Sequence, residues 1–110
     1  MTEHLSHEDF VLAQRAEAAR IAQDVLDGRL SVLEGARLIV RGGMAEDDPD
    51  FKKLVLVDEE AESLPVGSER RNWLPEALER KAAELVKTEE WAREVAFNAL
   101  RNIATRYGAA

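Results

Sequence analysis

The chain has 110 residues and a net charge of −7, with 45% hydrophobic residues, 34% charged residues and no cysteine. This length and balance suit one globular domain with a hydrophobic core and exclude general disorder. The missing cysteines exclude a disulfide framework, a thiolate metal site and a cysteine nucleophile.

Aromatic residues make up only 5% of the chain, while alanine and leucine are abundant. That composition favours helices over strands. We therefore expect an all-α single domain spanning 1–110, built from four to five helices.

Two short helices are predicted at the start of the chain, over about 7–27 and about 32–41. Gly28 suits the left-handed position that ends the first helix. Ser31 and Glu34 have the spacing of a capping box at the start of the second. Because only two residues separate Gly28 from Ser31, we expect an antiparallel helical hairpin.

A third helix is predicted over about 49–57, since Asp48 can cap it and Pro49 suits the first helical position. The apolar run Leu54–Val57 would also suit a buried strand. No other segment offers such a strand a partner, so we favour the helix.

The last predicted helix is long, over about 75–107, with apolar residues on most of its sides. Uninterrupted, it would measure roughly 50 Å. Either it is kinked or broken near 87–90, or it projects and pairs with another chain; the sequence leaves both open. Glu89 falls within the apolar stripe, where it would mark a kink, a buried ion pair with an arginine or an interface.

The negative charge is concentrated in residues 46–62, which hold eight acidic residues and two lysines. Such a segment repels nucleic acid and anionic lipid and attracts basic proteins. No apolar run is long enough to span a bilayer, and the N-terminus has no pattern of a secretory signal. We therefore expect a cytoplasmic protein that binds neither nucleic acid nor membrane.

An irregular segment is predicted over 58–74, because Pro65 and Gly67 interrupt regular structure there. In a structural interpretation, Trp73 and Leu74 pack over Leu78 and an arginine ties acidic residues 58–62 to the fold. In a functional interpretation, the paired arginines and the tryptophan form a recognition surface, since both residue types are enriched at binding hot spots. The two interpretations are compatible.

Known catalytic and metal-binding patterns are missing. His4 and His7 have helical spacing, but a folded metal site needs further ligands. Asp47, Asp48 and Asp50 lack the glycine that an EF-hand requires. No phosphate loop, nucleophile elbow or zinc-protease motif occurs, so we expect no cofactor, no metal and no catalytic residue.

The candidate partner-binding residues are those of the acidic segment and the loop that follows it. They are Asp47, Asp48, Asp50, Asp58, Glu59, Glu60, Glu62, Glu69, Arg70, Arg71 and Trp73.

Two stretches resemble a family of small uncharacterised bacterial helical proteins. One is Gly28-Arg29-Leu30-Ser31-Val32-Leu33-Glu34-Gly35-Ala36-Arg37. The other is Glu62-Ser63-Leu64-Pro65-Val66-Gly67, followed by Arg70, Arg71, Trp73, Pro75-Glu76-Ala77-Leu78 and Lys81. In that family the acidic pair lies farther from the Leu-Pro dipeptide than here. The resemblance implies a bacterial origin and a helical fold, but no activity.

Three functions agree with these patterns. The first is a non-enzymatic interaction protein, such as an immunity or antitoxin-like protein that masks a basic toxin with its acidic segment. The second is a structural or regulatory protein that forms homo-oligomers through its C-terminal helix. The third and least supported is an enzyme that uses carboxylates with Arg70 or Arg71.

Overall fold

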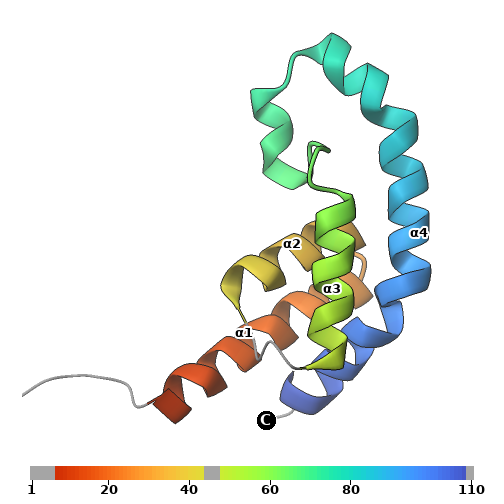
Figure 1. The fold of residues 1–110 in the computed structure, drawn as a ribbon. Helices are drawn as coiled ribbons and strands as arrows, with labels where there is room; N and C mark the ends of the chain where they lie inside the picture. The colour runs from red at the N-terminus through yellow and green to blue at the C-terminus, as the bar shows by residue number, and fades with distance from the viewer. Residues whose placement is uncertain (1–6, 44–47, 109–110) are drawn as a thin grey trace, which may run out of the picture.

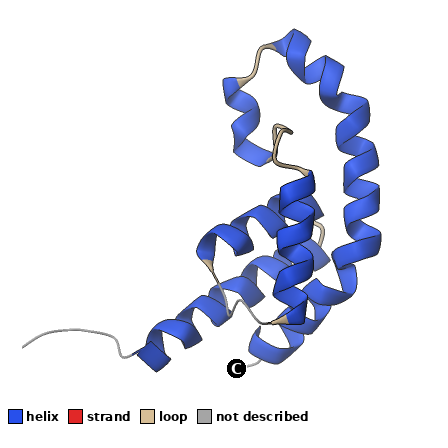
Figure 2. Ribbon diagram, in the orientation of Figure 1, coloured by secondary structure: helices blue, strands red, loops and turns tan. Residues whose placement is uncertain are grey.

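The structure, a computed structural model, describes residues 7–43 and 48–108. Its order is α1 (His7–Leu26), α2 (Val32–Gly42), α3 (Pro49–Glu60), the short 3-10 helix η1 (Gly67–Asn72) and α4 (Pro75–Gly108). These ranges contain helices and connecting turns but no strand (Figure 2). The predicted all-α fold is confirmed, and Leu54–Val57 lie in α3.

The first two helices form the predicted hairpin, with α2 packed against α1 (Figure 1). Gly28 has a φ of 83° beyond the end of α1, and Ser31 caps α2 by accepting a hydrogen bond from the Glu34 amide. Gly35 brings the helices close together: a Cβ there would lie 2.3 Å from the Val25 Cγ2.

The hydrophobic core lies between α1, α2, α3 and the second half of α4, which packs against both α1 and α3 (Figure 1). Its fully buried side chains include Ile39, Leu54, Leu100 and Ile103. The core therefore involves every long helix.

Helix α4 is one uninterrupted helix of 34 residues, so no break occurs near 87–90. Its buried residues all lie at Ala92 or beyond, and none of 75–91 is buried. The apolar side chains of Leu78 and Leu85 in this half are therefore only partly covered. Figure 1 shows this first half extending away from the core.

This projecting half makes the molecule elongated, with extents of 53 × 32 × 24 Å and a radius of gyration of 15.2 Å. A compact domain of this length would have a radius near 13 Å. An arm formed by η1, the turn after it and residues 75–91 projects from the core (Figure 1).

The predicted irregular segment 58–74 is wrong in part. Helix α3 continues to Glu60, and residues 67–72 form η1. Helix α3 is longer than predicted because Glu59 and Glu60 are good helix formers. Helix η1 was not predicted because 3-10 helices occur in short pieces, so one can form directly after the turn at Gly67, whose φ is 60°.

Candidate functional site

A buried arginine organises the acidic end of α3. Arg37 on α2 is 7% exposed and donates three hydrogen bonds of 2.7 Å, to Asp58 Oδ1, Glu69 Oε1 and the Ala61 carbonyl oxygen. One side chain thus fastens α2 to the end of α3 and to η1. The structural interpretation is confirmed in this respect, but the tying arginine is Arg37 rather than an arginine of the loop.

Two further contacts join α2 to η1. Arg41 Nη2 lies 3.2 Å from Glu69 Oε2. The Glu34 side chain lies against Gly67, where an added Cβ would be 2.6 Å from Glu34 Oε2. Residues 28–37 and residues 62–67 are therefore in direct contact through Glu34 and Gly67.

Glu89 fastens the arm to the core. Its Oε2 accepts a hydrogen bond of 2.7 Å from the Val32 amide, and its Oε1 accepts one of 3.1 Å from the Leu33 amide. A carboxylate is favoured there because the free amides and dipole of a helix N-terminus carry partial positive charge. Among the described residues Glu89 pairs with no arginine and instead caps another helix.

A second polar cluster joins the start of α3 to the end of α4. Asp48 accepts hydrogen bonds from the amides of Asp50 and Phe51, at 2.8 and 3.1 Å. Arg106 forms ion pairs with both aspartates, and Asn102 donates to Asp50 at 3.2 Å. The carboxylates of Asp48 and Asp50 therefore make their contacts within the fold, between α3 and α4.

Asp48 is held in its charged form by this cluster. Burial alone would raise its pKa, but the amides of Phe51 and Asp50 donate to the carboxylate and Arg106 lies beside it. Together with a contact to the Tyr107 hydroxyl, they bring the pKa of Asp48 below its ordinary value.

The candidate partner-binding residues fall into separate places in the structure. Asp48 and Asp50 are buried, Asp58 and Glu69 pair with Arg37, and Asp47 lies outside the described residues. The exposed members are Glu59, Glu60, Glu62, Arg70 and Arg71, and Trp73 is half-buried. Leu74 is 69% exposed, so it does not pack as expected.

A shallow hollow of about 300 Å³ lies between the end of α3 and the arm, lined by Glu60, Lys87, Thr88 and Trp91. Trp91 is half-buried, so its indole forms part of the surface of the hollow. Glu59 and Glu62 are exposed close to Glu60 in the chain, and no other described residue pairs with these three carboxylates. Sequence reasoning treated Trp91 only as apolar surface and did not connect it with Glu60.

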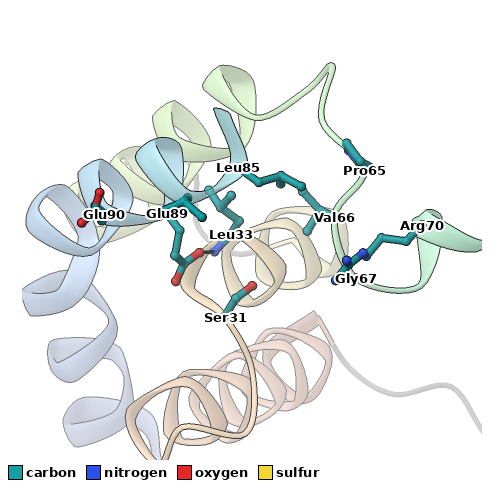
Figure 3. Close-up of a pocket in the computed structure, with 10 residues that line it drawn as sticks. Ser31, Leu33, Pro65, Val66, Gly67, Arg70, Leu85, Glu89 and Glu90 are labelled. Atoms are coloured by element: carbon teal, nitrogen blue, oxygen red, sulfur yellow. Dashed lines mark hydrogen bonds between the residues drawn. The ribbon is translucent and has the colours of Figure 1, made fainter. Parts of the chain in front are cut away.

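A second hollow of about 310 Å³ opens on the other face of the same part of α4 (Figure 3). Its lining comes from the start of α2, from residues 65–70 and from α4 residues 85–90. Most of its wall is apolar, and Arg70 lies at its edge.

Both hollows are lined by carboxylates, and the one at the end of α3 also by Lys87, but neither is lined by a histidine. The one histidine in the described part of the chain, His7, begins α1, and neither hollow is lined by it. Within residues 7–43 and 48–108, no group of three or more histidine, aspartate or glutamate side chains could hold a metal ion.

Comparison with protein-family models, curated proteins and solved structures found no match to this chain. None of the described helices has the length and apolar character needed to cross a membrane.

Proposed function

We propose that this protein is a non-enzymatic interaction module that binds a basic protein through the acidic end of α3. One observation carries the proposal. The carboxylates of Glu59, Glu60 and Glu62 are exposed and pair with no other described residue, and Glu60 lines a hollow that half-buried Trp91 also lines.

This surface suits an arginine or lysine side chain of a partner. A cation over the face of an indole is attracted by the ring, and a neighbouring carboxylate adds a charge-assisted hydrogen bond. Trp91 and Glu60 line one hollow and provide these two groups. Tryptophan is also among the residues that dominate binding energy at interfaces.

The negative charge of the whole chain also favours a basic partner. The chain carries −7 overall, and such a field speeds the approach of a basic partner in a salt-dependent way. Lys87 also lines the hollow, so its charge offsets one of the three carboxylates and leaves the local balance negative.

A tetra-arginine peptide tests this proposal. In a Trp73→Phe protein, Trp91 is the only tryptophan, so its fluorescence reports on the hollow alone. We expect the peptide to change this fluorescence with an affinity that falls as salt is added. Glu60→Gln and Glu62→Gln together should weaken binding severalfold, while the exposed control Glu79→Gln should not. Equal effects of the acidic pair and the control would contradict the proposal.

The narrower role is that of an immunity or antitoxin-like protein, for which the basic partner is a toxin. This protein, co-expressed with a basic toxin from a neighbouring gene, would then restore growth of the cells that produce the toxin. The variant carrying both Glu60→Gln and Glu62→Gln would reduce this rescue. Full rescue by the double variant would rule out this surface as the inhibitory one.

Self-association through α4 is the second candidate. The observation that favours it is the exposed apolar arm, where Leu74 and Val86 are 69% and 60% exposed. Two arms could bury these side chains against each other. Sedimentation velocity at increasing concentration would show a dimer that Val86→Glu abolishes; a monomer at every concentration would exclude this candidate.

A further inference from the structure

The hollow between residues 65–70 and the arm has a strongly apolar wall. Leu33, Pro65 and Val66 are buried and form its core side, while Leu85 is half-buried and Val86 is 60% exposed on the arm side. An occupant that covered the two arm residues would remove apolar surface from water, which is favourable.

The polar groups of this hollow are arranged with charges of opposite sign at its two sides. Figure 3 shows Arg70 running from η1 back toward Gly67 on one side, and Glu90 on the other. No other described residue pairs with Arg70. Its guanidinium therefore has all its N–H groups available, and guanidinium geometry matches a carboxylate.

The other polar groups do not oppose an anion near Arg70. Glu89 is already hydrogen-bonded to the Val32 and Leu33 amides at the start of α2, so the positive end of that helix offsets its charge. The Ser31 hydroxyl accepts from the Glu34 amide and keeps its own hydrogen for donation.

We infer that this hollow binds a small apolar carboxylate, with the carboxylate paired to Arg70 and the hydrocarbon part against Val66, Leu85 and Val86. This site is separate from the acidic surface beside Trp91, and it does not depend on the proposed partner.

The size of the hollow limits the ligand. Its volume of about 310 Å³ is at the lower end for small-molecule sites. Because a water molecule occupies roughly 30 Å³ of liquid, this space suits roughly ten non-hydrogen atoms. A medium-chain fatty acid such as octanoate has about this size.

Octanoate, octanol and octylammonium form a probe set that differs only in the head group. Each is titrated into isotope-labelled full-length protein while amide shifts are followed. We expect octanoate to shift residues 66–70 and 85–90 with a dissociation constant on the order of 1 mM or tighter. Octanol and octylammonium should bind several-fold more weakly.

Arg70→Gln and Arg71→Gln provide a matched pair, because both arginines are exposed and adjacent in η1. We expect Arg70→Gln to weaken octanoate binding about fivefold or more, and Arg71→Gln to leave it unchanged. The inference is overturned if millimolar octanoate shifts none of these residues, if octylammonium binds as tightly, or if both variants behave alike. Binding of tetra-arginine to the surface beside Trp91 is measured in a separate experiment, so the proposed function and the carboxylate site can each fail without the other.

Discussion

Replacing Arg37 with methionine should destabilise the fold more than replacing Arg41, Arg70 or Arg71. Methionine fills similar space but donates no hydrogen bond. Asp58 and Glu69 would lose their buried partner, and the Ala61 carbonyl would lose one of its donors. The change leaves the Asp58 carboxylate without its ion pair, Glu69 with only the exposed Arg41, and the Ala61 carbonyl with only the Leu64 amide.

The size of the effect follows from burial. Breaking a fully buried ion pair costs about 3–5 kcal/mol. The Asp58 and Glu69 side chains are 22% and 33% exposed, so water recovers part of that loss and we expect about 2–4 kcal/mol. For a domain of this length, this corresponds to a fall in Tm of roughly 10–20 °C.

Urea and thermal unfolding, followed by circular dichroism, measure this difference. Arg41→Met is the matched control, because Arg41 is 66% exposed and contacts Glu69 at 3.2 Å; it should cost less than about 1 kcal/mol. Adding Asp58→Asn to Arg37→Met should restore part of the stability, since it removes the charge that has lost its ion pair. If the two arginine variants were equally stable, the role given to Arg37 would be refuted.

Three further substitutions test the packing and capping contacts. Glu89→Gln should cost about 1 kcal/mol and speed hydrogen exchange of the first two amides of α2, whereas the exposed neighbour Glu90→Gln should do neither. Gly35→Ala should cost about 1–3 kcal/mol because its Cβ meets the facing helix, whereas Gly42→Ala meets nothing within 4 Å and should be neutral or stabilising by less than about 1 kcal/mol; equal effects would refute the close approach. Asp48→Asn should reduce stability at neutral pH, and its difference from the native chain should shrink as pH falls below about 4.

The sign of the last effect follows from the lowered pKa of Asp48. The charged carboxylate stabilises the native state above its unfolded pKa, and this stabilisation is lost as pH falls toward the folded pKa. A difference in unfolding free energy that stayed constant or grew in acid would show that the charge of Asp48 does not stabilise the fold. Unfolding in urea at a series of pH values provides the measurement.

Local signals predicted most of the fold. The helix starts at Ser31 and Asp48, and the helix end at Gly28, depend on residues a few positions apart, so the sequence contains them directly. The hairpin followed from its short connection. The all-helical class followed from composition.

The contacts that define the sites were beyond such reasoning because they join residues far apart in the chain. Arg37 lies 21 residues before Asp58 and 32 before Glu69, and Glu89 lies 57 after Val32. Asp48 and Glu60 were grouped as candidate binding residues because both lie in the acidic segment, but Asp48 is buried and Glu60 is exposed. One signal was present in the sequence. Arg37 lies within an apolar helix and acidic residues follow it in the chain, and this pattern favours a buried ion pair.

The central claim, that the acidic end of α3 and Trp91 together bind a basic side chain, is tested most directly by NMR. Unlabelled tetra-arginine peptide is added to isotope-labelled native protein, and the two indole N–H signals are followed with the backbone amides. We expect shifts at Trp91 and at residues 59–62 and 87–91, with Trp73 unchanged. Shifts at Trp73 and η1 with Trp91 unchanged, or no shifts at low salt, would contradict it.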